Sequence, residues 1–131
     1  MAAGLSAVNL ANAWLNVVRG GGSGVTFTAP ATIFGQLHTG DPGASGTGNV
    51  ATTSTRQAFT FGAASAGAIA LSNSPVFTGA ATETITHISF WSASSSGTFY
   101  WSAALTASKA INSSDTLTFT SAGIALTPLA A

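Results

Sequence analysis

Apolar and polar residues alternate with a period of two along most of the chain after residue 24. The clearest run is TETITHISFW, residues 82–91, in which Ile85, His87, Ser89 and Trp91 fall on one face. Alternate side chains of a strand line one face of a sheet, and β-branched threonine favours extended backbone. Comparable runs predict further strands within residues 25–29, 32–39, 56–65, 67–71, 75–79, 98–105 and 113–126.

The first twenty residues follow a helical period instead. Ser6 is suited to cap the start of a helix, and Leu10, Trp14, Val17 and Val18 recur at the spacing of one apolar stripe. The glycine-rich segment RGGGSG then ends the helix. A helix this short must dock onto something to persist, either on its own domain or on a partner subunit.

These elements predict a mainly β protein with one N-terminal α-helix. Turn signals recur about every eight to twelve residues between the strands, which is typical of an antiparallel β-sandwich or barrel, here of about eight short strands. We expect a single domain, with the helix and glycine-rich connector in residues 1–24 and the antiparallel β region in residues 25–131.

Composition changes the picture of the surface. Only 5% of the 131 residues are charged, against about 25% in an ordinary domain, while 46% are hydrophobic and the formal net charge is zero. A monomer normally relies on interspersed charges to stay dispersed. We therefore expect much of the surface to be covered by copies of the chain or by neighbouring proteins.

The same numbers exclude several classes of partner. Three scattered basic residues cannot form a phosphate-tracking stripe, so nucleic-acid binding is not expected. No continuous apolar run reaches the 18 residues or so of a membrane span, and the N-terminus lacks the basic region of a secretory signal. There is no cysteine, and therefore no disulfide or thiolate metal site.

Enzymatic chemistry finds little support in the motifs. His38 and His87 could be combined with Asp41, Glu83 or Asp115 into a triad or a metal site, but neither a nucleophile-elbow motif nor a short ligand spacing is present. The glycines after residue 39 match no phosphate-binding fingerprint. The sequence predicts no catalytic residue, no metal site and no cofactor.

The stretch LHTGDPG is better explained as a turn. Asp41 can accept hydrogen bonds from nearby backbone, Pro42 presets φ, and Gly43 tolerates positive φ. His38, at the end of the preceding strand, is then expected to be a packed or capping histidine.

Aromatic residues are the candidates for core or interface anchors, since such side chains dominate both kinds of contact. We select Trp14, Phe34, Trp91, Phe99, Tyr100 and Trp101. The sequence leaves open which of them are core and which are interface. If Tyr100 and Trp101 were exposed, they could also stack on a glycan.

Several segments resemble a family of small bacteriophage virion proteins of the tail-fibre or minor tail type. The similarity spans nearly the whole chain and is sharpest in LHTGDPG, RQAFTFGAAS, and the THISFW strand followed by LTASK and DTL. Family members more often carry alanine at the position of Gly40. The resemblance implies a non-enzymatic building block on the exterior of the phage particle.

Two functions follow as expectations. The first is a self-associating virion component, either a tail-fibre or minor tail protein or a capsid decoration protein, whose partners are copies of itself and other capsid or tail proteins. The alternative is a receptor- or glycan-binding module at a tail tip, which would engage a host-surface glycan.

Overall fold

The computed structural model describes residues 3–19, 27–53 and 55–127. Its elements in chain order are η1 (Ala7–Ala11), a π-helical turn, then α1 (Asn12–Val18), β1 (Ile33–His38), β2 (Gln57–Phe59), β3 (Ala68–Ala70), β4 (Val76–Thr78), β5 (Glu83–Trp91), β6 (Phe99–Ile111), β7 (Thr116–Thr118) and β8 (Gly123–Ala125). The predicted class, mainly β with one N-terminal helix and antiparallel strands, is confirmed, and the sheets of the described residues do not close into a barrel.

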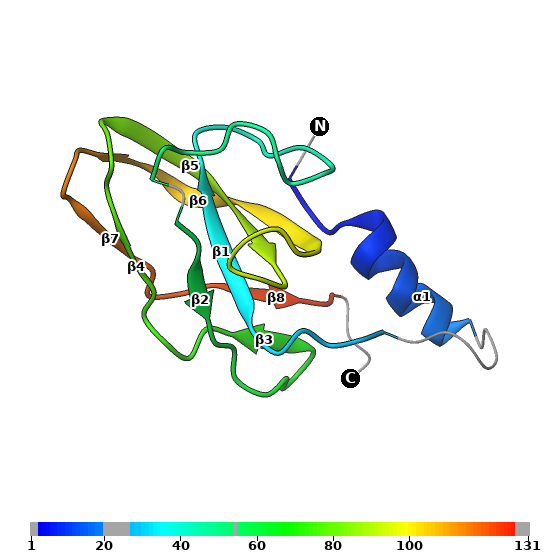
Figure 1. Cartoon of the computed structure of the whole chain (residues 1–131). Helices are drawn as coiled ribbons and strands as arrows, with labels where there is room; N and C mark the ends of the chain where they lie inside the picture. Colours follow the sequence, from blue (N-terminus) through cyan, green and yellow to red (C-terminus); the bar gives the residue numbers. More distant parts are fainter. Residues whose placement is uncertain (1–2, 20–26, 54, 128–131) are drawn as a thin grey trace.

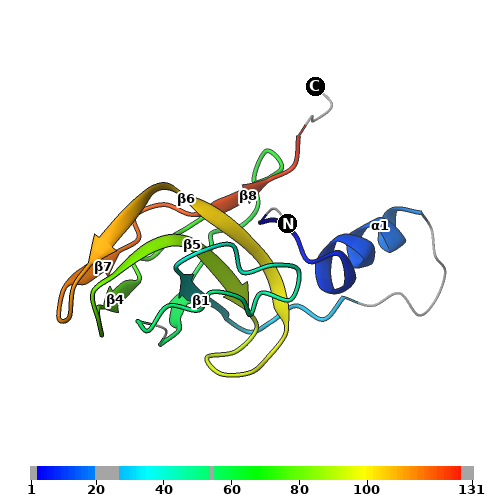
Figure 2. The ribbon, with the colours of Figure 1, turned by 90° about the horizontal axis from the view of Figure 1, so that it is seen from above.

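The strands form one four-stranded sheet, in the order β2–β1–β5–β6, and two ribbons, β3–β8 and β4–β7. Figures 1 and 2 show β5 and β6 as a long curved hairpin with the helix standing off at one end of the β body. The chain just before η1 joins the free edge of β6, where the N–H of Ser6 donates to the carbonyl of Tyr100 (2.7 Å).

Aromatic side chains join the sheet to the ribbons. Phe59 of β2 is 1% exposed and lies with its ring centroid 5.2 Å from Phe90 of β5, 6.2 Å from Phe77 of β4 and 5.5 Å from Phe119. Gly35 of β1 is required beside this cluster, because a Cβ there would collide with the Phe59 ring. The aromatic core therefore joins the four-stranded sheet to the β4–β7 ribbon and to Phe119 just after β7.

The helical segment differs from its predicted stripe. Ser6 caps it as expected, with its hydroxyl accepting from the N–H of Asn9 (3.3 Å), and Leu10 is buried. Val17 and Val18, however, are 60% and 83% exposed, so these two members of the stripe do not dock on their own domain, and docking on a partner subunit stays a prediction. The π-helical turn shifts the phase of the stripe, and α1 extends beyond the β body that could cover it.

Two strand boundaries also differ from expectation. Residues 27–29 of the expected strand 25–29 are not in a strand, while residues 25 and 26 lie outside the described residues. An alternating pattern allows extended backbone, but a strand forms only where a neighbouring strand edge is free to pair with it. Phe27 instead packs edge-on against Tyr100, with ring centroids 6.1 Å apart. The strand expected to begin near residue 98 continues to Ile111, because it follows β5 across a register shift between Ile85 and His87.

Candidate interaction surfaces

The loop after β1 is a turn held by its own side chains. The Asp41 carboxylate accepts from the N–H of Gly43 (2.8 Å), and Gly43 has φ of +73°. The carbonyl of Pro42 accepts from the N–H of Gly48 (2.9 Å), and the Asn49 side chain donates to the carbonyl of Asp41 (2.8 Å). Asp41 is thus engaged in local structure of the kind that Asx turns provide.

His38 is fully buried and forms the centre of a hydrogen-bonded chain. Its Nδ1 lies 2.7 Å from the carbonyl of Gly48, and its Nε2 lies 2.7 Å from the Ser89 hydroxyl, which also accepts from Trp91 Nε1 (2.7 Å). A carbonyl can only accept, so Nδ1 carries the proton and Nε2 accepts from Ser89. Burial lowers the pKa of His38, partly opposed by the bond to Gly48, and the histidine is held neutral.

The structure does not bring the ionisable residues together into a catalytic or metal-binding cluster. His87 lies opposite His38 across the β1–β5 pair and bonds to the hydroxyl of Thr86 (2.8 Å). The Asp115 carboxylate accepts from the backbone of Asn112 (2.8 Å) in the β6–β7 turn. Within the described residues no three His, Asp or Glu side chains are placed to share a metal ion.

Glu83, at the start of β5, fixes the segment before β2. Its two carboxylate oxygens accept from the backbone N–H groups of Thr52 (2.9 Å) and Thr53 (2.8 Å). Burial alone would raise the pKa of Glu83, but the hydrogen bonds from Thr53 and Thr52 outweigh it and leave the pKa below its ordinary value. This carboxylate is therefore a structural clamp.

Arg56 plays the same part for the loop between β5 and β6. It donates to the carbonyls of Ala93 (2.9 Å) and Ser96 (2.7 Å) and to the Gln36 side chain (3.0 Å), and its guanidinium lies 4.0 Å from the centre of the Trp91 ring. This role of Arg56 was not predicted from the sequence. The only sequence signal was Trp91 at the end of its strand, which offers a ring face to a cation.

The structure places the selected aromatic residues in two settings. Trp91, Phe99, Tyr100 and Trp101 are buried, whereas Phe34 and Trp14 are partly exposed. Tyr100 and Trp101 are only 7% and 8% exposed, so neither presents an open ring face on which a glycan could stack. The suggestion of an exposed Tyr100–Trp101 platform is therefore wrong. These two rings pack inside the fold because β6 carries them into the aromatic core, where Trp101 stacks on Phe90 at 4.4 Å.

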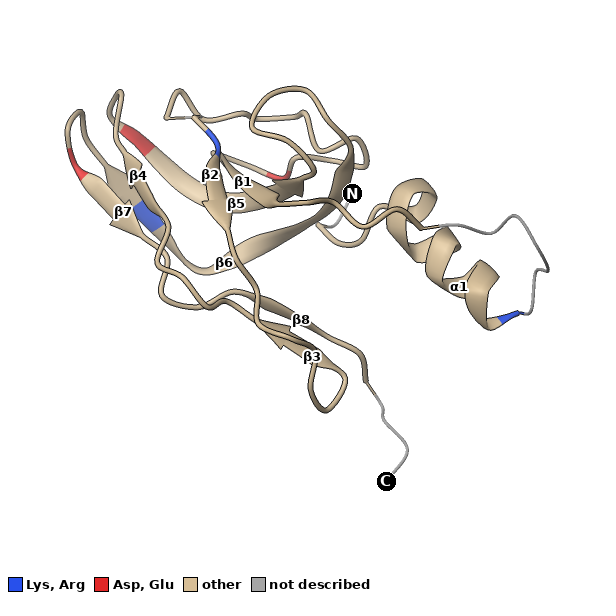
Figure 3. Ribbon diagram, turned by 60° about the horizontal axis from the view of Figure 1, so that its bottom comes forward, with Lys and Arg blue, Asp and Glu red and all other residues tan. Residues whose placement is uncertain are grey.

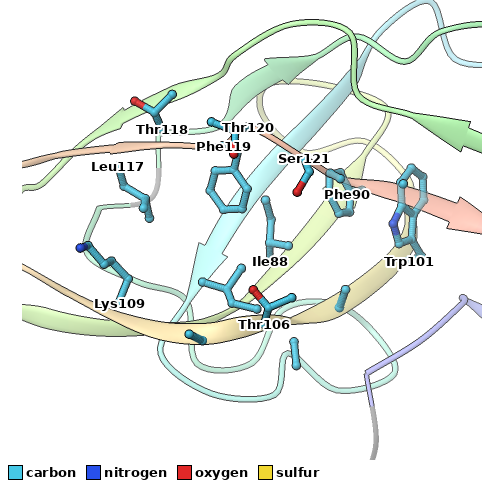
Figure 4. A pocket seen from close by; sticks show the side chains of 16 residues that line it. Ile88, Phe90, Trp101, Thr106, Lys109, Leu117, Thr118, Phe119, Thr120 and Ser121 are labelled. Atoms are coloured by element: carbon cyan, nitrogen blue, oxygen red, sulfur yellow. The ribbon is translucent and has the colours of Figure 1, made fainter.

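One recess lies between β6 and the chain from β7 to β8. It has a volume of about 450 Å³, and Figure 4 shows Ile88, Phe90 and Phe119 pointing between the two strands, with Trp101 at one end and Lys109 at the other. The hydroxyl-bearing residues along it are Thr106, Thr118, Thr120 and Ser121, all exposed. The recess thus combines apolar floor with polar walls.

A second recess lies between the helix and the β3–β8 ribbon, and we call it the apolar groove. It has a volume of about 400 Å³ and is lined by Leu10, Trp14, Phe27, Pro30, Ile33, Phe61, Ala64, Gly67, Ala68, Ile69, Tyr100, Trp101, Ile124 and Leu126. No charged residue lines it. Figure 3 shows how sparsely Lys, Arg, Asp and Glu are placed over the molecule.

Across the described residues, polar and ionisable side chains such as Asp41, Glu83 and Arg56 hold loops and turns in place. No helix among the described residues is long and apolar enough to cross a membrane.

The family model described as Podophage GP4 fiber I protein gp80 matches residues 5–127. No curated protein matches the chain. The chain belongs to this family and is a fibre-type structural protein of a phage virion, which confirms the resemblance to phage tail-fibre proteins at the level of the family.

Proposed function

We propose that the chain is a non-enzymatic, self-associating subunit of a phage fibre on the exterior of the particle. The observation that carries self-association is the exposed apolar surface of the helical segment, where Val8, Leu15 and Val18 are 78%, 65% and 83% exposed. A chain in which 5% of residues are charged has few groups to keep such a surface dispersed.

A non-enzymatic role is supported by the hydrogen bonds that ionisable side chains make within the fold. His38 is buried and bonded on both ring nitrogens, and the carboxylates of Asp41 and Glu83 accept from backbone N–H groups. A general base needs a free, accessible atom near a substrate. These side chains serve the fold instead.

Sedimentation velocity of the purified chain tests self-association. We expect one oligomer that persists on dilution through the micromolar range, because many apolar contacts are covered together. A single species of monomer mass at all concentrations, without added virion proteins, would contradict the proposal.

Location on the particle is tested by immunogold labelling of purified virions. The fibre family favours labelling on fibres over labelling across the capsid surface. Copy number from quantitative mass spectrometry gives the second readout, since a decoration protein of a capsid lattice is present in hundreds of copies and a fibre subunit in tens (estimates from closed symmetry). Hundreds of copies over the capsid would favour the decoration role.

Glycan binding is the second candidate function, and the recess beside β6 is the observation that favours it. Threonine and serine hydroxyls line an opening above the partly exposed ring of Phe119, the combination that sugars bind. Trp101 borders this recess, so titration with host-surface saccharides should change tryptophan fluorescence, and Phe119→Ala should abolish the change. Unchanged fluorescence across saccharides from the host surface would reject this function.

A further inference from the structure

Exposed apolar side chains gather at one end of the molecule. Nine large hydrophobic residues are exposed among those described. Six of the nine belong to the helical segment η1–α1 or to the lining of the apolar groove: Val8, Leu15, Val17, Val18, Phe27 and Leu126. Of the other three, Leu5 bridges to Trp101 of β6, and Val50 and Val76 lie on the β body. Most of the exposed large hydrophobic side chains are thus gathered on one surface and are not spread over the whole molecule.

The helical segment that carries most of this surface is short. No residue of α1 is buried, and η1 and α1 together span twelve residues, five and seven, at the lower end of the roughly 12–15 that an isolated helix needs to be even marginally stable in water. Figures 1 and 2 both show α1 projecting away from the sheets. Leu10 and Trp14 pack toward the body, and the face with Val8 and Leu15 remains bare.

The apolar groove beside the helix offers the complementary shape. Leu10 and Trp14 form one side, Ile69 and Ile124 of the β3–β8 ribbon contribute to the other, and Phe61 also lines it. The lining is almost wholly apolar, so a polar or charged partner would lose hydration there without gaining hydrogen bonds.

We propose that the bare face of η1 and α1 in one copy docks into the apolar groove of a second copy. The inference rests on the proposed self-association and names its surface. The four exposed side chains of the helical segment, together with the groove and its exposed Phe27 and Leu126, amount to on the order of 500 Å² of apolar surface per copy, approaching the roughly 800 Å² that each partner buries in a standard interface.

A second copy fits this surface better than a partner of another chemistry. Arg19, at the end of α1, is the only charged residue in residues 3–19, and the groove has none. Neither surface therefore carries a charge pattern that would select an acidic or basic partner. Each copy instead supplies both a projecting apolar helix and an apolar groove of matching character.

Sedimentation velocity of three aspartate variants tests the proposal. Val18→Asp charges the helix, Leu126→Asp charges the groove, and Val76→Asp is the control, since Val76 is exposed but lies on β4 away from both. We expect each of the first two changes to raise the dissociation constant at least tenfold and the control to leave it within twofold. Near-ultraviolet circular dichroism verifies that each variant is folded.

Cross-linking gives a second readout that does not depend on weakening the contact. The chain has no cysteine, so Val18→Cys and Ala64→Cys chains can be mixed and joined with a short bis-maleimide. Ala64 is exposed and lines the groove, and exposed Ala80, outside the groove, provides the matched control as Ala80→Cys. We expect a peptide linking positions 18 and 64 of two chains, and none linking 18 and 80.

The outcomes separate this inference from the proposed function. A wild-type oligomer that Val18→Asp and Leu126→Asp leave intact, with no 18–64 link, would overturn the docking mode while self-association stands. A wild-type chain that stays monomeric would overturn both.

Discussion

The β body and the helical end of this protein differ in how far their side chains are buried and hydrogen-bonded. In the body, buried side-chain polar atoms of the described residues all have hydrogen-bond partners, and Phe59 of the four-stranded sheet packs against Phe90 of the same sheet, Phe77 of β4 and Phe119, which follows β7. At the helical end, seven residues of α1 bury nothing fully and expose valine and leucine. The first region buries its side chains within one chain, whereas we propose that the second is covered by another copy.

The two regions also differ in how many ionisable side chains they contain. Several ionisable side chains stabilise loops of the body: Arg56 holds the β5–β6 loop, Glu83 holds the segment before β2, and Asp41 shapes the turn after β1. The helical end carries one charged residue, Arg19, within residues 3–19. Mutations should therefore affect folding when they fall in the body and association when they fall in the helix.

The largest expected effect is at Phe59. Phe59→Ala removes a ring that is 1% exposed and contacts Phe77, Phe90 and Phe119, so we expect a loss of about 3–5 kcal/mol in the free energy of unfolding. Urea unfolding monitored by tryptophan fluorescence measures it. A loss below about 1 kcal/mol would mean that the aromatic cluster is not the core.

The buried polar chain should give the next largest effect. Ser89→Ala leaves Trp91 Nε1 without an acceptor and His38 Nε2 without a donor, at a cost of about 1–3 kcal/mol for unsatisfied buried groups. The same urea experiment applies, with Ser94→Ala, an exposed serine of the β5–β6 loop, as the control. Equal stability of the two variants would contradict the network.

The pH dependence of stability should show His38 as a neutral buried group. Because burial lowers its folded-state pKa below the ordinary value of 6.5, the unfolded chain binds more protons, and stability rises with pH. The stabilising contribution of neutral His38 to the free energy of unfolding is fully present above pH 6.5. It is lost as pH falls from there toward the pKa of His38 in the folded state, by at most about 1.4 kcal/mol per pH unit.

Thermal unfolding between pH 7.5 and 5.5 (roughly one unit either side of the ordinary histidine pKa) tests this prediction. His38→Gln should flatten the profile. The lowered pKa of Glu83 acts in a separate window below its ordinary value of 4.5, where stability is lost as that carboxylate is protonated. A wild-type profile that falls with rising pH would contradict the burial of a neutral His38.

The smallest expected effect is at the helical end. Leu15 is 65% exposed, and alanine is a better helix former, so Leu15→Ala should change the unfolding free energy of dilute protein by less than about 0.5 kcal/mol. Chemical unfolding at nanomolar concentration measures it. A cost comparable to that of Phe59→Ala would show that the helix is packed on its own body and would remove the contrast between the two regions.

Much of the fold was predictable because the signals were local. The alternation over residues 82–91 predicted β5, and the Ser6 cap with the following helical pattern predicted the N-terminal helix. The turn chemistry of Asp41 and Gly43 was similarly readable, because an Asx turn needs only neighbouring residues.

The parts that failed depend on contacts between distant segments. The alternating pattern at residues 27–29 could not reveal that no partner edge is available, and the spacing of Val17 and Val18 could not decide between docking on their own domain and docking on a partner. Arg56 reaches carbonyls about 40 positions away, which no local pattern encodes. Ser89 had a signal, since it shares a strand face with Trp91, but its partner His38 comes from β1.

Hydrogen–deuterium exchange of the wild-type chain at increasing protein concentration tests the central claim most directly. We predict that the amides of residues 12–18 become protected as concentration rises, while those of the β5–β6 hairpin are protected at every concentration. Exchange of residues 12–18 that is independent of concentration, at levels where the chain is otherwise assembled, would contradict the account.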